Sequence, residues 1–348
     1  MAEATPHTQQ ETTDAPTAAS ASGQTRQEET AGGGAWRERL KGAAERLAPL
    51  LFLILISVFL SLTTDTFLTV QNILTILLQI SVIGIVAVGQ TMVMITAGID
   101  LSVGSVVGLS GVVATLLMAS FGWPVGLAVL GGVGVGAAAG VVNGLLVTSV
   151  KIPPFIATLG MMSIARGAAL VLTGGTAVHD VPAAFDWLGN GTILGIPVPV
   201  VMLTGVVAVM TVVLRKTTLG RHAFAIGSNE ETARMSGVGV SKELVKVYTL
   251  CAGLAGLGGV ILSSRTTIGS PTAGQMYELD AIAACVIGGT SLFGGVGSVG
   301  GAVIGAGLMG LIRNGSNLLG VSSFWQRIVI GVIICIAVAW DQYRRRNA

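Results

Sequence analysis

Apolar residues fill long, continuous stretches of this chain instead of alternating with polar residues. A stretch of about 20 apolar residues lets a helix cross a bilayer. Because lipid offers no hydrogen bonds, a spanning backbone forms helices or a closed barrel, and barrel strands alternate apolar and polar positions. The continuous stretches therefore predict ten membrane helices, near residues 47–64, 72–97, 102–120, 124–147, 154–172, 198–214, 245–264, 280–290, 297–312 and 322–340.

Basic residues are unevenly distributed among the segments that connect these stretches. Loops 65–71, 119–124 and 173–197 contain no Lys or Arg, whereas the segment from Arg215 to Lys246 holds six of the 19. Cytoplasmic loops carry the excess of Lys and Arg in membrane proteins. The distribution predicts about ten crossings, with the N- and C-termini both in the cytoplasm.

Composition agrees with a membrane protein and argues against other classes. The 348 residues are 52% hydrophobic and only 10% charged, whereas soluble domains carry about 25% charged residues. The 50 glycines suit helices that pack closely through small side chains. A net charge of +2 offers no basis for nucleic-acid binding. The predicted fold class is therefore all-α, a multi-pass helical membrane protein.

The chain divides into a polar beginning, a membrane domain and a short basic end. Residues 1–46 lack an apolar period and are expected to form a disordered cytoplasmic tail with a basic lead-in. The membrane domain is expected over residues 47–342 and includes a long charged loop at 215–244. Residues 343–348 are expected to be a basic cytoplasmic tail. The first apolar stretch begins too late for a signal peptide.

The sequence lacks the residue patterns of a nucleotide or metal site. A phosphate-binding loop needs Gly-Lys followed by Ser or Thr, and no lysine of this chain follows a glycine. The three histidines do not form a His-Glu-x-x-His motif. Neither metal-ligand spacing nor a disulfide framework is present among the cysteines, which are expected to be small core residues; they are Cys251, Cys285 and Cys335. We therefore predict neither an enzyme nor a metal site.

A short helix is predicted inside the charged loop, between Gly227 and Gly237. Its first turn combines a capping side chain with acids that complement the helix dipole, namely Ser228 or Asn229 followed by Glu230 and Glu231. Gly237 can end the helix, which would then present Ala233, Arg234 and Met235. The residues alone leave two interpretations open: an ordinary solvated helix, or a helix that docks into a partner protein.

Five stretches of the chain together resemble one family. The charged loop resembles the coupling loop of the ribose-type monosaccharide permeases of ATP-binding-cassette (ABC) importers. Four further motifs are similar to the same family: GQTMVMITAGIDLSVGS at 89–105, PTAGQMYELDAIAA at 271–284, GGTSLFGG at 288–295 and NGSNLLGVSS at 314–323. The resemblance covers roughly residues 50–342 and leaves out the N-terminal tail.

This resemblance implies a complete transport system in a bacterial cytoplasmic membrane. Two permease chains would form the pathway, separate ABC ATPase subunits would use ATP and magnesium, and an extracytoplasmic sugar-binding protein would deliver a monosaccharide. The permease itself would carry no cofactor. The charged loop would seat in the ATPase and transmit its closure. The residues that the resemblance assigns to this coupling are Gly227, Asn229, Glu230, Glu231, Ala233, Arg234, Ser236 and Gly237.

Polar residues within or beside the apolar stretches are candidates for the pathway or its gate. They are Gln90, Thr96, Asp100, Asn143, Arg166, Asn314 and Asn317. Each has a structural alternative: Asp100 can cap the following helix, Arg166 can pair within the protein, and the amides can bond between helices. Glu278 and Asp280, predicted at the outer start of a helix, are either helix-start acids or contacts for the binding protein.

Two other functional classes stay open. A self-sufficient secondary transporter of a small neutral solute would need membrane-buried acids or histidines for ion coupling, and among the acids only Asp100 is evident. A membrane scaffold or receptor would carry no solute at all. The sugar also stays open, because ribose is the nearest by resemblance while galactose, xylose and arabinose are alternatives.

Overall fold

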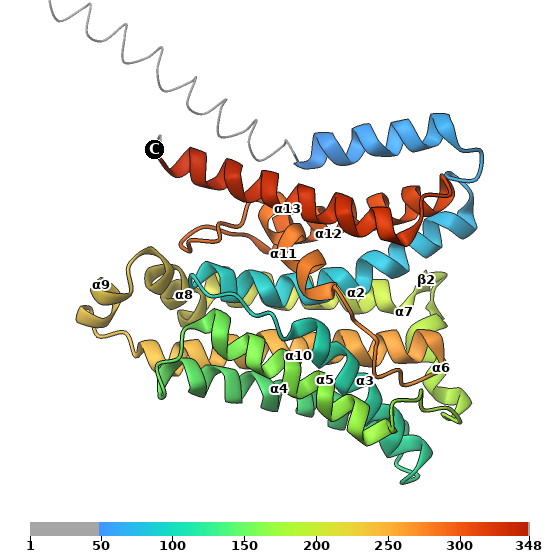
Figure 1. Ribbon diagram of the computed structural model, residues 1–348, viewed down its shortest axis with the longest axis horizontal. Helices are drawn as coiled ribbons and strands as arrows, with labels where there is room; N and C mark the ends of the chain where they lie inside the picture. Colours follow the sequence, from blue (N-terminus) through green and yellow to red (C-terminus); the bar gives the residue numbers. More distant parts are fainter. Residues whose placement is uncertain (1–48, 347–348) are drawn as a thin grey trace, which may run out of the picture. The chain divides into compact units, whose positions relative to one another are not determined.

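The computed structural model describes residues 49–346 as a set of long helices with one small hairpin (Figure 1). The predicted tail at 1–46 and the last two residues of the basic end lie outside the described residues. The helices are Pro49–Thr63, α2 Val70–Ile95, α3 Val103–Ala119, α4 Val125–Thr148, α5 Pro154–Thr173, α6 Ala183–Asn190, α7 Val198–Lys216, α8 Thr218–Ser228, α9 Glu230–Met235, α10 Val240–Thr266, α11 Tyr277–Ile287, α12 Val299–Leu318 and α13 Ser323–Arg346. The hairpin pairs β1 (Thr192–Ile193) with β2 (Ile196–Pro197).

Each predicted apolar stretch coincides with a helix, although several helix ends differ by a turn or more. Helix α13 continues to Arg346, so it includes much of the segment predicted as a basic tail. The pattern missed α6, α8 and the hairpin. These elements are too short or too polar to stand out as apolar stretches.

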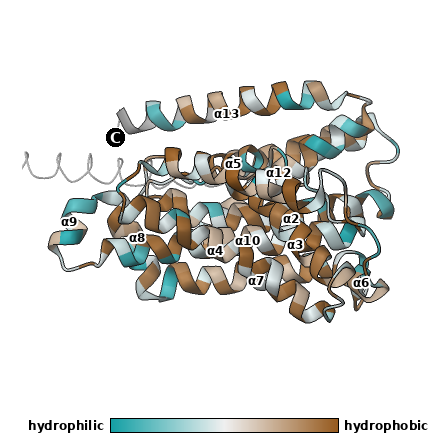
Figure 2. Cartoon of the chain, turned by 60° about the horizontal axis from the view of Figure 1, so that its bottom comes forward, coloured by the Kyte–Doolittle hydropathy of each residue, from teal (hydrophilic) through white to brown (hydrophobic). Residues whose placement is uncertain are grey.

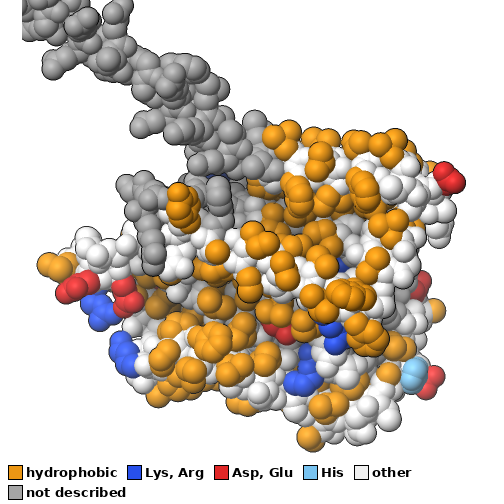
Figure 3. All heavy atoms as spheres, turned by 45° about the horizontal axis from the view of Figure 1, so that its top comes forward, with side chains coloured by type: hydrophobic (Ala, Val, Ile, Leu, Met, Phe, Trp, Pro, Cys, Tyr) orange, Lys and Arg blue, Asp and Glu red, His pale blue; other side chains and the backbone are white. Residues whose placement is uncertain are grey.

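Six of the described helices are long and apolar enough to cross a membrane: α2, α4, α5, α7, α10 and α13. The helix at 49–63 and α3 are apolar but shorter, and α11 has only 11 residues. Hydrophobic residues dominate the long helices, whereas α9 is hydrophilic (Figure 2). Figure 3 shows hydrophobic side chains spread over much of the visible surface. The chain is therefore a multi-pass membrane protein, but the predicted count of ten exceeds the number of helices that meet these criteria.

Helices α2 and α12 run antiparallel in the core of the body. Near the start of α2, the Asn72 side chain exchanges two hydrogen bonds, of 3.2 and 2.6 Å, with Asn314 near the end of α12. At the other end of α2, the Ile95 carbonyl accepts from the amide of Gly295, which precedes α12, at 3.0 Å. Contacts at both ends thus fix the register of the two helices.

Glycines bring α4 and α10 into backbone contact. The facing glycines recur every fourth residue on α4, at Gly132, Gly136, Gly140 and Gly144. A Cβ atom on Gly140 would lie 2.3 Å from the Tyr248 carbonyl oxygen, and one on Gly144 would lie 2.7 Å from the Val245 Cα. Small residues at this spacing let membrane helices approach closely. Helix α4 therefore packs along much of the antiparallel helix α10.

Two non-helical segments, each partly buried, interrupt the series of helices. Residues 96–102 separate α2 from α3, and Ala97 in this segment has a φ of 60°. Residues 267–276 separate α10 from α11. Irregular backbone at membrane depth is tolerated only where protein or a water-filled cavity surrounds it. The polar side chains around these segments are therefore needed first to form hydrogen bonds with the backbone groups that no helix satisfies.

The close packing of α4 on α10 makes a testable distinction between two glycines of one helix. Gly140→Ala should destabilise the protein, because the added methyl meets backbone, and overpacking typically costs about 1–3 kcal/mol. Gly134→Ala is the matched control, since its Cβ would meet open space. Alanine there should leave stability unchanged or raise it by about 0.5–1 kcal/mol. Thermal unfolding in one detergent compares them, and equal melting temperatures would contradict the backbone contact.

Candidate functional site

Helices α8 and α9 form a platform, residues 217–239, between α7 and α10. The Thr217 side chain caps α8 by accepting from the Gly220 amide at 3.5 Å. Asn229 caps α9, and its side-chain oxygen accepts from the Thr232 amide at 2.8 Å. These bonds satisfy amides that the first turn of a helix leaves free. The predicted short helix is confirmed, with Asn229 as its cap.

The inner side of α9 is packed onto the platform. Ala233 is buried and forms a small apolar cluster with Ile226 of α8 and Val240 of α10. The sequence-based expectation that this alanine is presented to a partner is wrong. The hydrophobic methyl instead holds α9 against its two neighbouring helices.

The outer side of α9 is open to solvent. Arg234 and Glu230 form an ion pair of 2.6 Å along this side, and Met235 is 84% exposed. An exposed methionine next to charged residues is typical of a surface that adapts to a partner. Met235 was not among the residues assigned to coupling, although it lies beside them. The other assigned residues on the open side are Glu231, Ser236 and Gly237.

A cavity of about 360 Å³ lies between the platform and the ends of the membrane helices. Glu230 and Arg234 of α9 line it together with Thr96, which follows α2. Lys151, between α4 and α5, and Tyr248 of α10 are among its other polar lining residues. The structure thus brings two predicted coupling residues and one predicted gating residue to the same space.

Gly227 is the point where the platform meets the membrane body. It is buried near the end of α8, and a Cβ there would lie 1.7 Å from the Ile95 carbonyl oxygen at the end of α2. The same carbonyl accepts the hydrogen bond from Gly295 at 3.0 Å. Gly227 therefore does not lie on the open side of the platform. It permits direct backbone contact with α2.

Gln90, Asp100 and Asn143 belong to one fully buried polar network. The Asp100 carboxylate accepts from the backbone amide of Ser102 at 2.8 Å and from its hydroxyl at 2.5 Å. Asn143 donates to the same hydroxyl at 3.0 Å. The Gln90 amide, in the orientation that satisfies both its atoms, bonds the Asp100 backbone at 3.1 and 3.2 Å. These side chains hold the break between α2 and α3.

Arg166 holds the other interrupted segment. Its guanidinium donates to the carbonyl oxygens of Pro271 at 2.5 Å and Ala273 at 2.9 Å. A planar guanidinium suits this double contact because its donors lie in a fixed fork. Thr96 bonds within its own helix, to the Val93 carbonyl at 2.7 Å. The contacts of Arg166 correspond to its structural alternative, whereas Thr96 does not bond to another helix through this hydrogen bond.

Glu278 and Asp280 lie in the first turn of α11, as their helix-start alternative predicted, but Asp280 is not on an outer surface. Asp280 is fully buried and forms an ion pair with Arg313 of α12. Glu278 is partly buried against the start of α3, where Gly104 leaves room for its carboxylate. Helix α11 starts inside the body, after the interrupted segment, and this position removes its first acids from the outer surface.

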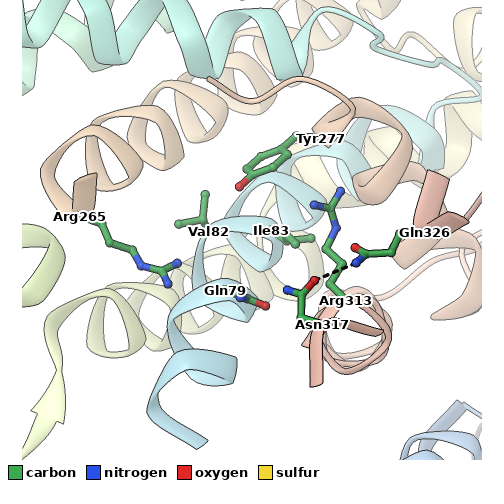
Figure 4. Close-up of a pocket in the computed structure, with 8 residues that line it drawn as sticks. All are labelled: Gln79, Val82, Ile83, Arg265, Tyr277, Arg313, Asn317 and Gln326. Carbon is green, nitrogen blue, oxygen red and sulfur yellow. Dashed lines mark hydrogen bonds between the residues drawn. The ribbon is translucent and has the colours of Figure 1, made fainter. Parts of the chain in front are cut away.

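A second cavity, of about 180 Å³, lies near the opposite end of α2 and α10 from the platform (Figure 4). Its lining is mostly polar and comes from five helices: Gln79, Val82, Ile83, Arg265, Tyr277, Arg313, Asn317 and Gln326. Asn317 accepts from the Gln326 amide at 2.8 Å, which joins α12 to α13. Of the predicted pathway residues, only Asn317 lines this cavity; Asn314 instead bonds Asn72.

Sequence reasoning missed the rest of this lining. Arg265 and Arg313 are far apart in the sequence, so their convergence depends on the fold. The one signal in the sequence is that both are basic residues in segments with few other Lys or Arg. Within residues 49–346, no cluster of three or more His, Cys, Asp or Glu side chains is arranged to hold a metal ion.

Comparison with known proteins adds to this geometry. Residues 72–338 match the family model described as "Branched-chain amino acid transport system / permease component". Ribose import permease protein RbsC of Bacillus subtilis (strain 168) is 44% identical over 314 residues, which cover 90% of this chain and 97% of that protein. The protein of the same name from Escherichia coli (strain K12) is 43% identical, with 85% and 93% covered.

Relatives with other names are similar over the same region. Xylose transport system permease protein XylH of Escherichia coli (strain K12) is 36% identical, over 85% of this chain and 91% of that protein. No solved structure matches the chain. The resemblance to sugar importer permeases is confirmed by these matches, which extend over most of each protein. The chain therefore belongs to the family of branched-chain amino acid transport system permease components.

Proposed function

We propose that this chain is the permease subunit of an ATP-driven ABC importer for a monosaccharide, with ribose as the first candidate. The observation that carries the proposal is the nearly end-to-end similarity to ribose import permeases. Similar permeases with names that refer to L-arabinose, D-allose and xylose support the sugar class. Two copies of the chain would form the pathway, as the family resemblance implies.

The energy for transport would come from a separate ATPase subunit. This chain has no Gly-Lys-Ser/Thr motif that could bind nucleotide phosphates, so it is not itself the ATPase. Its contact with the ATPase would be the open side of α9, with Arg234 and Met235 at the centre. The buried side of α9 is anchored through Ala233, which supports a rigid docking element.

The platform offers a direct route for movement into the membrane body. Helix α9 is anchored to α8 and α10, and Gly227 of α8 lies against the Ile95 carbonyl. A displacement of α9 would therefore reach the end of α2 and, through the Gly295 hydrogen bond, the segment before α12. Packed elements transmit such shifts because they do not deform continuously. An ATPase that moves the platform would act on both helices together.

The proposal includes ten membrane segments with both termini in the cytoplasm. Antiparallel contacts join α2 to α12 and α4 to α10, as alternating crossings require. The helix at 49–63, α3, α11 and α12 would complete the set of ten with the six long helices. The platform connects α7 to α10, and the segment from Arg215 to Lys246 that contains it carries the basic residues expected on the cytoplasmic side.

The candidate pathway residues take different parts in this proposal. Asn317 would face the solute from the cavity of Figure 4. The other six would shape the pathway by holding its interrupted helices: Gln90, Thr96, Asp100, Asn143, Arg166 and Asn314. An extracytoplasmic sugar-binding protein would contact the exposed hairpin, where Leu194 is 99% exposed, in place of Glu278 and Asp280.

One observation favours a second candidate, a secondary transporter. The buried ion pair of Asp280 and Arg313 is the kind of ionisable group that couples solute to ion movement in such carriers. The two functions differ in what they need. Proteoliposomes that hold this chain alone should take up no sugar if the importer proposal is correct, and an ion gradient should not change that result.

The role of α9 is tested by Met235→Asp. A charge at the centre of the docking surface should weaken ATPase binding by at least about tenfold, because central interface residues often contribute about 2 kcal/mol or more. ATP-driven uptake in proteoliposomes with the ATPase and binding protein should fall accordingly. Lys242→Ala, on an exposed side chain beyond α9, is the control and should leave both unchanged. Unaltered binding in the Met235 variant would contradict the docking assignment.

The proposed orientation is tested by cysteine labelling at two exposed positions. In a Cys335→Ser background, Leu194→Cys should react with a membrane-impermeant maleimide in intact cells, because it lies on the proposed outer side. Met235→Cys should react only after the cells are permeabilised. The remaining cysteines, Cys251 and Cys285, are buried and should stay unlabelled. Labelling of Met235→Cys in intact cells would reverse the proposed topology.

A further inference from the structure

The cavity of Figure 4 contains polar atoms whose hydrogen-bonding capacity is unused. Gln79 Oε1 and Arg313 Nε are buried and lack a hydrogen-bond partner within the described part of the chain. None of the ion pairs found in residues 49–346 includes Arg265. A buried polar atom without a partner costs about 1–3 kcal/mol. Gln79 and Arg313 both line the cavity, so a polar occupant that reached these two buried atoms would satisfy them.

The arrangement of the lining narrows the chemistry of the occupant. Figure 4 shows the side chains of Gln79, Arg265 and Tyr277 directed toward the same space, with Val82 and Ile83 beside them. The amide oxygen accepts hydrogen bonds, the guanidinium donates them, and the phenol does both. Hydroxyl groups match this mixture because each one both donates and accepts. The two apolar side chains suit the C–H face of a sugar ring.

The volume of the cavity and the charges around it further restrict which molecules can occupy it. The volume of about 180 Å³ is below the roughly 300–1,000 Å³ of pockets for drug-sized ligands, which suits a single sugar ring. The charge of Arg313 is balanced by Asp280, and the Arg313 guanidinium lies 5.9 Å from the centre of the Tyr277 ring. Arg265 is then the only lining guanidinium without an acidic partner among the described residues, and it can donate to neutral hydroxyls.

We propose that this cavity is a monosaccharide-binding site within the permease itself, occupied by a neutral sugar on its way from the binding protein. The inference rests on the proposed function and adds a binding step to it. Gln79 Oε1 accepts from one sugar hydroxyl, while Arg265 and Arg313 Nε donate to others. The Asn317–Gln326 hydrogen bond holds α12 against α13 at this cavity.

The test measures equilibrium binding of radiolabelled ribose to the full-length permease in nanodiscs, without ATPase or binding protein. We expect saturable, weak binding that unlabelled ribose competes away. Gln79→Leu and Arg265→Met should each weaken it by about tenfold or more, as loss of a hydrogen bond at a charged or buried group does. Two variants are used because either one alone can impair folding, and thermal unfolding identifies a misfolded sample.

Matched controls apply the same chemical changes outside the cavity. Gln71→Leu alters an exposed glutamine of α2, and Arg327→Met alters an exposed arginine of α13. Both should bind ribose like the unaltered protein. The proposal is overturned if the permease alone binds no ribose, if both cavity variants bind normally, or if an anionic sugar acid binds in preference to neutral sugars.

Failure of this site can be told apart from failure of the importer assignment. ATP-driven uptake by the complete system, with no ribose binding to the permease alone, would overturn the site and leave the importer standing. Binding to the permease that the cavity variants weaken, without ATP-driven uptake in the complete system, would support the site and reject the importer. Xylose and arabinose serve as further probes, and weakening of their binding by the same variants supports a shared site.

Discussion

The satisfaction of backbone polar groups at the two helix breaks is the constraint on which the rest of this structure depends. In a membrane, an N–H or C=O group outside a helix finds no water, so protein must supply its partner. The Ile99 carbonyl accepts from Thr158 at 3.1 Å, and Gln90 serves the backbone of Asp100. At the second break, Arg166 donates to two carbonyls. Thr158, Gln90 and Arg166 are therefore engaged by the backbone, whereas Asp100 Oδ2 and Asn143 Oδ1 at the first break lack a hydrogen-bond partner within the described residues.

Helix α10 connects the two places where the chain meets other molecules. It begins at Val240, which packs on the buried side of α9, and its last turn contains Arg265, which lines the proposed sugar site. Between these ends the glycines of α4 press directly on its backbone. A helix held so closely moves as a unit, because packed interfaces shift between discrete arrangements. Movement of the platform would thus displace the residues at the cavity, while α10 itself stays unchanged in conformation.

The sequence predicts local features well, but it does not predict which distant residues meet in the fold. Apolar stretches located the long helices, and the cap and acids at Asn229 and Glu230 located α9, because both signals lie within a few neighbouring residues. The cavity gathers Gln79 and Gln326 from opposite ends of the chain, and no short pattern records that meeting. The burial of Asp280 was missed for the same reason. Its position depends on the interrupted segment before α11, which the apolar pattern does not place in depth.

Arg166 and Arg265 show that the role of a polar residue depends more on its partners than on its residue type. Both are arginines in apolar helices, and either would be costly without compensation. The carbonyls of Pro271 and Ala273 engage Arg166, so the charge stabilises the fold. Arg265 lines a cavity together with Gln79, whose amide oxygen lacks a hydrogen-bond partner among residues 49–346. A sugar loses its hydration water when it enters a protein. Side chains with unused hydrogen-bonding capacity beside a cavity can replace that water as partners of the sugar hydroxyls.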